Sequence, residues 1–205
     1  MALALVAVSC SSGDSGSQVE GLCGRPGDSA AGKSLREVLG TDDFTAEAVK
    51  SDDSFAEQFR KDLKEWPGGP DSTSPSFVCK YLPDDNENHV VLSFAWSPAD
   101  QPGRERAEGG KVYDVSGTTG SAGHLAAELF TPCELGGELA EPSRKAVLRA
   151  DATLTVDRGR NVDQQRVAQE LSFLYLMTRE ATKVLGCENQ PLAKEPVVKP
   201  LATER

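Results

Sequence analysis

The sequence of 205 residues lacks any apolar run that approaches the ~20 residues a helix needs to span a bilayer. It has only two histidines, His89 and His124, and neither has a neighbour at metal-ligand spacing. None of its five cysteines lies in a Cys-x-x-Cys pair, which excludes zinc-ribbon and thioredoxin-type sites. Its 22 basic residues are outnumbered by 32 acidic ones, for a net charge of −10. Because phosphate neutralisation needs clustered Lys and Arg, this balance argues against nucleic acid or an anionic membrane face as the main partner.

Motifs of common enzyme classes are missing as well. The Gly/Ser/Thr-rich run 116–123 has no Lys at the P-loop position, and no Gly-x-Ser-x-Gly nucleophile elbow occurs. We interpret this run as a flexible connection between strands. A triad of Ser121, His124 and Asp114 is disfavoured, because triad members usually come from separate loops. The acidic stretch 84–87 does not fit a calcium loop and reads as a solvated turn. The sequence therefore assigns no catalytic residue, metal or cofactor.

Apolar residues make up 38% of the sequence, which is adequate for a single domain with one core. Strands are expected at residues 77–82, 90–96, 112–115, 125–130 and 148–157, and helices at 34–39, 52–66 and 163–185. Because the strands are grouped between helices, we predict an α+β fold. It would consist of an antiparallel β-sheet of about five strands, helices packed on that sheet, and one long C-terminal helix.

The strand expected at 148–157 has the most regular alternation. Leu148, Ala150, Ala152 and Leu154 would lie on one face, and polar residues such as Arg149 would lie on the other. This pattern is typical of an antiparallel strand with one buried and one solvated face.

The two ends of the chain differ in composition from the middle. Residues 1–10 resemble the end of a secretory leader followed by a bacterial lipobox, in which a cysteine is diacylated. Val8 and Ser9 fit the lipobox, whereas Ala7 departs from its usual Leu and the basic n-region is missing. We therefore expect a signal-peptide remnant at 1–9, lipidation at Cys10 and a Ser/Gly-rich tether at 10–33. The alternative is a cytosolic protein with a frayed apolar start and an incidental cysteine.

The domain itself is expected at 34–188, followed by a disordered tail at 189–205 with three prolines and alternating Lys and Glu. Apart from Cys10, four cysteines remain, spread across the chain: Cys23, Cys79, Cys133 and Cys187. Two disulfides formed in an oxidising compartment account for this even number. Four cysteines allow three pairings, and these residues alone do not choose among them.

The order of these features resembles small secreted lipoproteins of unknown function that are common in actinobacteria. The matching positions are Cys10, Cys23, the helix end Leu39-Gly40, Cys79, Cys133 and Cys187. The resemblance covers residues 10–188 and implies the disulfides Cys23–Cys79 and Cys133–Cys187. Such families carry no agreed catalytic residues, so the resemblance implies none here.

Two groups of side chains are candidates for binding. Arg158, Arg160 and Arg166 cluster at the start of the last expected helix, where a helix N-terminus favours anions. The alternative is a solvated turn whose charge is balanced by neighbouring acids. A second group consists of the aromatic residues Trp66, Tyr81, Trp96 and Tyr113. They would form a recognition patch if two of them were exposed on one face of the sheet. Otherwise we expect them to pack in the hydrophobic core.

The sequence thus leads to a functional expectation. It is an exported lipoprotein on the extracellular face of the cell membrane, with a non-catalytic domain that binds an envelope protein, a glycan or a small apolar ligand. The first alternative is an envelope hydrolase whose site is assembled from distant loops, and the second is a purely structural envelope protein. A sizeable pocket around His124 or a carboxylate pair would favour the hydrolase.

Overall fold

The computed structural model describes residues 21–24, 26–66, 68–84, 88–100, 110–155 and 164–201. The strands are β1 (Phe44–Ala48), β2 (Ser76–Pro83), β3 (His89–Pro98), β4 (Lys111–Val115), β5 (Thr118–Ala122), β6 (Ala126–Pro132), β7 (Ala146–Thr155) and β8 (Val198–Pro200). The helices are α1 (Ala30–Leu39), α2 (Asp52–Glu65), α3 (Ala140–Arg144) and α4 (Gln164–Leu185), with short 3₁₀ turns at Leu22–Gly24 and Gly137–Leu139.

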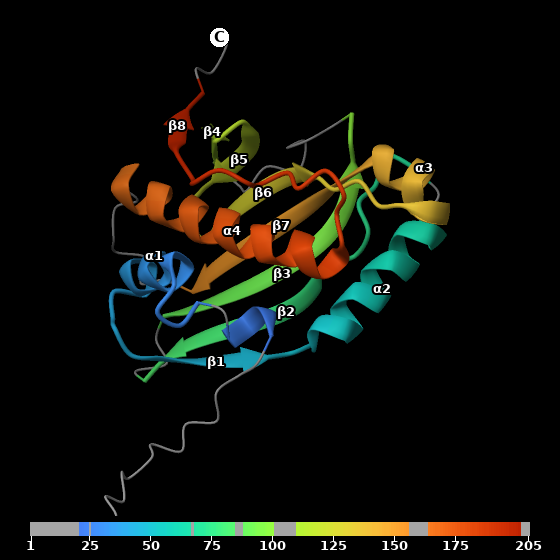
Figure 1. Ribbon diagram of the computed structural model, residues 1–205. Helices are drawn as coiled ribbons and strands as arrows, with labels where there is room; N and C mark the ends of the chain where they lie inside the picture. The colour runs from blue at the N-terminus through green and yellow to red at the C-terminus, as the bar shows by residue number, and fades with distance from the viewer. Residues whose placement is uncertain are drawn as a thin grey trace, which may run out of the picture.

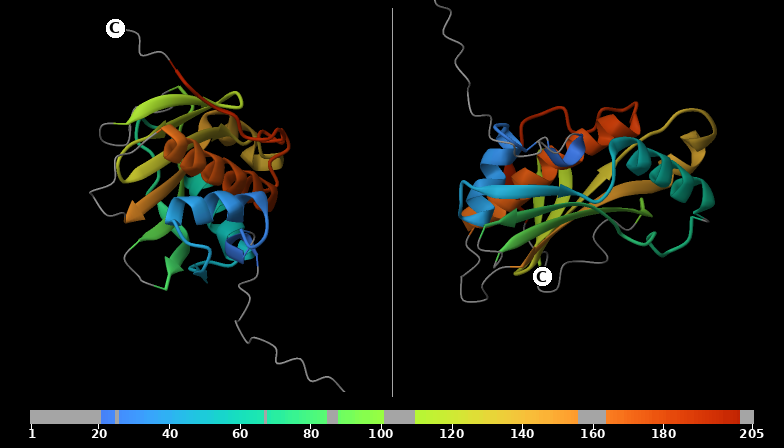
Figure 2. Two further views of the ribbon diagram at one scale, coloured as in Figure 1. Left: turned by 90° about the vertical axis from the view of Figure 1, so that its left-hand side faces the viewer. Right: turned by 90° about the horizontal axis from the view of Figure 1, so that it is seen from below.

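The strands form one antiparallel sheet in the order β1-β2-β3-β7-β6-β5-β4-β8. Helices α1, α2 and α4 cover one face of this sheet (Figure 1), and the view from below shows them on the same side of the strands (Figure 2). The α+β class and the antiparallel sheet are therefore confirmed, and the 22 residues of α4 agree in part with the expected long C-terminal helix.

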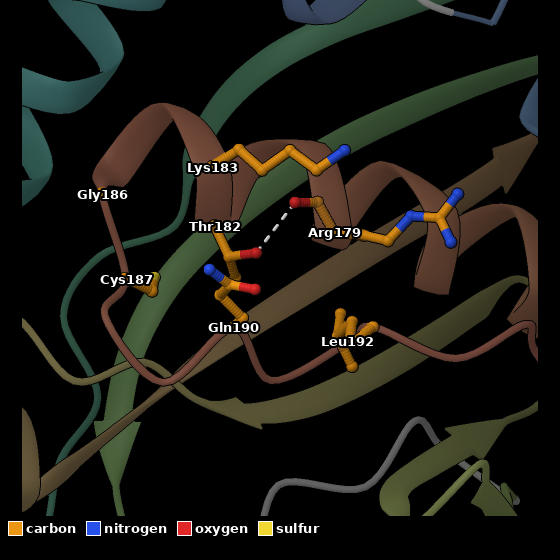
Figure 3. Close-up of a pocket in the computed structure, with 8 residues that line it drawn as sticks. Arg179, Thr182, Lys183, Gly186, Cys187, Gln190 and Leu192 are labelled. Carbon is orange, nitrogen blue, oxygen red and sulfur yellow. Dashed lines mark hydrogen bonds between the residues drawn. The ribbon is translucent and has the colours of Figure 1, made fainter.

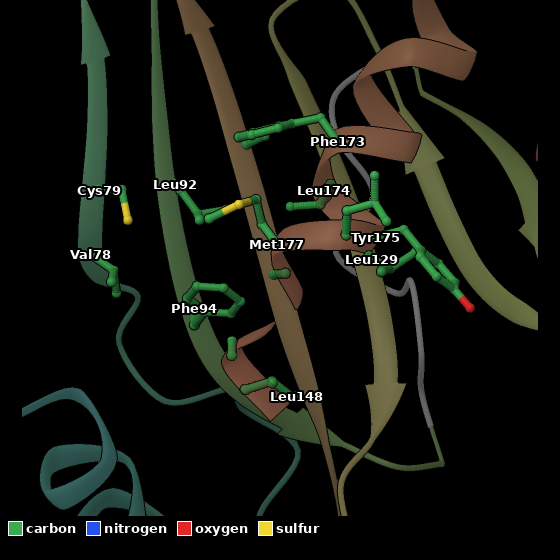
Figure 4. Packing of buried hydrophobic residues seen from close by; sticks show 14 of the residues in the cluster. Val78, Cys79, Leu92, Phe94, Leu129, Leu148, Phe173, Leu174, Tyr175 and Met177 are labelled. Atoms are coloured by element: carbon green, nitrogen blue, oxygen red, sulfur yellow. The ribbon is translucent and has the colours of Figure 1, made fainter. Parts of the chain in front are cut away.

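Helix α4 lies at the centre of the helical layer. Five consecutive side chains, Phe173 to Met177, are buried, although a helix on a sheet usually buries only one stripe. Met177 points towards Leu92 and Phe94 of β3, while Tyr175 lies on another side of the helix (Figure 4). Contacts on several sides bury α4, and no described helix is long and apolar enough to cross a membrane.

Two buried disulfides connect distant parts of the chain. Cys23 is bonded to Cys79, which joins the 3₁₀ turn at Leu22–Gly24 to β2. Cys133, just after β6, is bonded to Cys187, just after α4. This is the pairing that the resemblance to secreted lipoproteins implies.

The expectation of about five strands is wrong, because eight strands lie within the described residues. The additional strands are β1, β5 and β8. In β1 no side chain is fully buried, and the alternation of Phe44, Ala46 and Ala48 with Thr45 and Glu47 is too short and too weakly apolar to stand out in the sequence. The run read as a flexible connection, 116–123, contains a tight turn at Ser116-Gly117, both with positive φ, followed by β5. β5 consists of small residues, three of them with hydroxyl side chains, and Leu171 of α4 packs over its Gly120.

The ends of the domain also differ from the sequence-based boundaries. Leu22 and Cys23 are buried, and α1 begins at Ala30, capped by Ser29, so the packed domain extends into the expected tether. Residues 188–201 follow α4 and end in β8 beside β4, in place of the expected disordered tail. We call residues 188–201 the C-terminal strap. Residues 1–20, including Cys10, and residues 202–205 lie outside the described residues.

Candidate functional site

A pocket of about 520 Å³ lies between the last turns of α4 and the C-terminal strap (Figure 3). Its size falls within the range of about 300–1,000 Å³ that is usual for small-molecule sites. The lining residues are Arg179, Thr182, Lys183, Gly186, Cys187, Gln190, Leu192 and Ala193. The pocket therefore combines two cationic side chains with an apolar wall.

The local sequence explains why the chain reverses here. Gly186 has a φ of 78°, and the backbone N–H of Cys187 donates to the carbonyl of Thr182 at 2.9 Å. A glycine in this conformation is the usual way to end an α-helix. The disulfide from Cys187 to Cys133 then holds the chain, immediately before the strap, against the end of β6. Gln190 also has a positive φ, 41°, which is uncommon for a residue with a side chain.

Contacts at both ends hold the C-terminal strap beside α4. At its start, the Asn189 side chain accepts from the N–H of Glu134 and donates to the carbonyl of Pro132. At its end, the Ser116 hydroxyl donates to the carbonyl of Glu195 at 2.7 Å and accepts from the N–H of Val197 at 2.8 Å. Between these points Leu192 is 2% exposed. The wall of the pocket is thus fixed by the fold before any ligand arrives.

Arg179 is the central charge of the pocket. Its Nη1 lies 3.5 Å from Glu195 Oε1, and its Nε lies 3.8 Å from Glu180 Oε1, which is too long for a hydrogen bond. Nε is buried and has no hydrogen-bond acceptor among the described residues. A guanidinium with an unused Nε–H suits a carboxylate or phosphate, because both can accept two parallel hydrogen bonds from its fork.

The remaining polar groups of the pocket do not suggest catalysis. Lys183 is paired with Glu180 at 2.7 Å, and the Thr182 hydroxyl donates to the carbonyl of Arg179 at 2.8 Å (Figure 3). Cys187 is oxidised in a disulfide and is therefore no nucleophile. No histidine or carboxylate is among the residues that line the pocket.

The possible triad is not assembled. The Ser121 hydroxyl donates to Glu128 Oε2 at 2.7 Å, and Asp114 Oδ1 accepts from the N–H of Gly117 at 2.7 Å. His124 is exposed in the turn between β5 and β6. Within the described residues, no group of three or more His, Cys, Asp or Glu side chains is placed to hold a metal ion.

Of the expected arginine cluster, only Arg166 can be described. Arg158 and Arg160 lie outside the described residues. Arg166 donates to Glu170 at 3.0 Å on the same helix, where Glu170 is 3% exposed. Burial raises the pKa of Glu170 and outweighs the ion pair with Arg166, which lowers it. Arg166 therefore compensates a buried acid.

A row of polar side chains crosses the sheet on the face away from the helices. Ser121, Glu128, Asp151 and Ser93 occupy directly paired positions on β5, β6, β7 and β3, so they share one face. Beside them Arg149 donates to Asp151 at 3.2 Å and is only 7% exposed. On this polar face of β7, which was expected to be solvated at least in part, only Thr153 and Thr155, at the end of the strand, are exposed. Sequence periodicity shows that apolar and polar residues alternate along a strand. It does not show whether the polar face of that strand is buried in the folded protein.

The aromatic candidates are distributed between core and surface. Tyr81, Trp96 and Tyr113 are buried, whereas Trp66 is partly exposed at the end of α2. They do not form a common exposed patch. The pocket residues Arg179 and Lys183 were not singled out from the sequence. The uninterrupted apolar run 173–177 was the available signal, because a helix that is apolar all round must be covered on every side.

Comparison of the chain with models of protein families, with curated proteins and with solved structures finds no match in any of the three. The two disulfides agree with a small disulfide-containing domain. The function must accordingly be argued from the geometry of the pocket.

Proposed function

We propose that this protein is an exported lipoprotein of the cell envelope whose α+β domain binds, without catalysis, a small organic anion in the pocket beneath the C-terminal strap. The observation that carries the proposal is the Arg179 guanidinium at this pocket, with its Nε–H buried and without an acceptor among the described residues. A carboxylate or phosphate ligand would supply acceptors to this guanidinium, which Glu195 meets only at 3.5 Å.

The other lining residues define the class of ligand. Lys183 adds a second positive charge to the lining. A ligand carboxylate or phosphate would compete with Glu180 and Glu195, which already pair with these two cations. Leu192, Ala193 and Cys187 provide the apolar part of the wall. The ligand class that fits best is therefore an acid with an apolar body.

The binding proposal is tested by calorimetric titration with octanoate and octyl phosphate, with 1-octanol as the uncharged comparison. We expect one of the two anions to bind more tightly than octanol, and Arg179→Ala to weaken that binding by roughly 10- to 100-fold. This range corresponds to the loss of a hydrogen bond to a charged group. Lys194→Ala serves as the control, because this exposed strap residue does not line the pocket. Equal binding of the anions to wild type and Arg179→Ala, or no binding of either anion to the wild type, would contradict the proposal.

The location is proposed from the sequence at Cys10 and from the two disulfides, which are typical of oxidising compartments. Acylation at Cys10 would anchor the domain to the extracellular face of the cell membrane. Mass spectrometry of the intact protein from its native host tests this. We expect a chain that begins at Cys10, carries lipid, and gains four hydrogens on reduction. A full-length chain without lipid and with five free thiols would overturn the proposed location.

A further inference from the structure

A second hollow, of about 460 Å³, lies on the protein surface between α2 and the segment that leads into β2. Its lining residues are Gln58, Asp62, Glu65, Trp66, Thr73, Ser74, Pro75 and Ser76. None of them lines the pocket beneath the C-terminal strap. We call this hollow the Trp66 groove.

Both walls of the Trp66 groove are held in place by hydrogen bonds. On one wall, the indole N–H of Trp66 donates to the carbonyl of Asp71 at 3.0 Å, which fixes the plane of the ring. On the other wall, Thr73 is bonded twice to Trp96 of β3. Its N–H donates to the Trp96 carbonyl at 2.8 Å, and its hydroxyl accepts from the Trp96 N–H at 2.9 Å. A groove with fixed walls loses little conformational entropy when it binds a ligand.

The lining consists of groups that donate and accept hydrogen bonds around one aromatic ring. Gln58 supplies an amide, Ser74 and Ser76 supply hydroxyls, and Asp62 and Glu65 supply carboxylates. No Lys, Arg or His lines the groove, which disfavours an anionic ligand. A sugar ring has hydroxyls around its edge and a face of C–H groups, and that face is complementary to the electron-rich face of an indole.

We infer that the Trp66 groove binds a saccharide, with one sugar ring stacked on the Trp66 indole and its hydroxyls bonded to Gln58 and Asp62. Gln58 Nε2 already donates to Asp62 Oδ1 at 2.6 Å, so the two side chains form a preset polar pair. An organic cation fits less well, because cages for quaternary ammonium groups use several aromatic faces and Trp66 is the one aromatic residue in this lining. This site is separate from the anion pocket proposed above.

Tryptophan fluorescence tests the inference directly. The chain has two tryptophans, and Trp96 is fully buried in the core, so a ligand that changes the emission by contact must touch Trp66. The purified protein is titrated with cellotetraose, maltotetraose and the tetramer of N-acetylglucosamine. We expect at least one of them to bind, to shift the emission and to protect it from quenching by acrylamide. That binding should not depend on salt, because the sugars are uncharged.

Single substitutions test whether the saccharide binds in the Trp66 groove or elsewhere on the surface. Trp66→Ala is expected to abolish the spectral change and to weaken binding, measured by calorimetry, at least roughly tenfold. Gln58→Ala keeps the Trp66 fluorophore. It is expected to weaken saccharide binding but to show the same change in tryptophan emission as the wild type once the site is saturated. Glu57→Gln is the control, because this residue is exposed on α2 and does not line the groove.

Two results would overturn the inference. One is the absence of binding by all three tetrasaccharides at millimolar concentration. The other is salt-sensitive binding of tetramethylammonium that is tighter than that of any sugar and is lost in Trp66→Ala, which would assign the groove to organic cations. Either result leaves the anion pocket untouched, since that pocket is read out with other probes.

Discussion

Replacing Cys133 and Cys187 together with alanine is expected to lower the free energy of unfolding by about 4 kcal/mol. The disulfide joins positions separated by 54 residues, and opening a loop of that length increases the conformational entropy of the unfolded chain. Urea denaturation followed by circular dichroism, without reductant, measures the loss against the wild type.

The matched control is the double replacement of Cys23 and Cys79, which are 56 residues apart. The chain-entropy effect is nearly the same, so the two double variants should lose similar stability. They differ at the C-terminal strap, because Cys187 lines the anion pocket and Cys23 does not. Only the Cys133/Cys187 variant should therefore also bind octanoate or octyl phosphate less tightly. A loss below about 1 kcal/mol in both variants would contradict the entropic account.

Trp96→Ala is expected to cost about 3–5 kcal/mol of stability, the range for removing a large aromatic side chain from a packed core. Trp96 is 0% exposed, and its ring centroid lies 6.1 Å from that of Phe59 on α2. Its indole N–H donates to the carbonyl of Phe59 at 2.9 Å, so the side chain joins β3 to α2 by packing and by a hydrogen bond. The midpoint of urea denaturation should fall accordingly.

Trp66→Ala is the natural comparison, because it removes the same type of side chain from a partly exposed position at the C-terminal end of α2. Its cost should be clearly smaller, since less apolar surface is returned to water. If the two variants lost equal free energy of unfolding, the burial of Trp96 would contribute less to stability than we expect from its position in the core.

The sequence predicts best those elements whose pattern is set by a single buried face. Leu148, Ala150, Ala152 and Leu154 alternate regularly and form the helix-facing side of β7, as expected. Helix α4 was equally clear from its length and apolar content. In both cases the hydrophobic effect acts on residues close in sequence, so the period is visible without a structure.

The missed elements are strands because of the strands that they pair with, and their own residues show no strong pattern. β5 is built from small polar residues and is a strand because β4 and β6 lie on either side of it. β8 is three residues long in a stretch rich in prolines, and it forms because the edge of β4 is available. Propensity carries little information at such positions, since pairing and burial decide the outcome.

The anion pocket was not predicted from the sequence for the same reason. Arg179 and Lys183 have the spacing of ordinary solvated residues on a helix, and residues 188–201 have the composition of a disordered tail. The pocket exists because Gly186 and the disulfide at Cys187 direct that tail back along α4. Only the fold brings the cationic side chains and Leu192 together.

Assembly of the sheet depends on β7, which lies between β3 and β6 although it follows both in the chain. Strands β1 to β3 and β4 to β6 can each pair with near neighbours, but β3 and β6 keep an open edge until β7 arrives. Closing such long-range contacts slows folding relative to local pairing. Cys23 and Cys79 both precede this step in the chain, whereas the segment between Cys133 and Cys187 contains β7 itself. The loop closed by the Cys133–Cys187 disulfide therefore contains the strand that joins the two halves of the sheet.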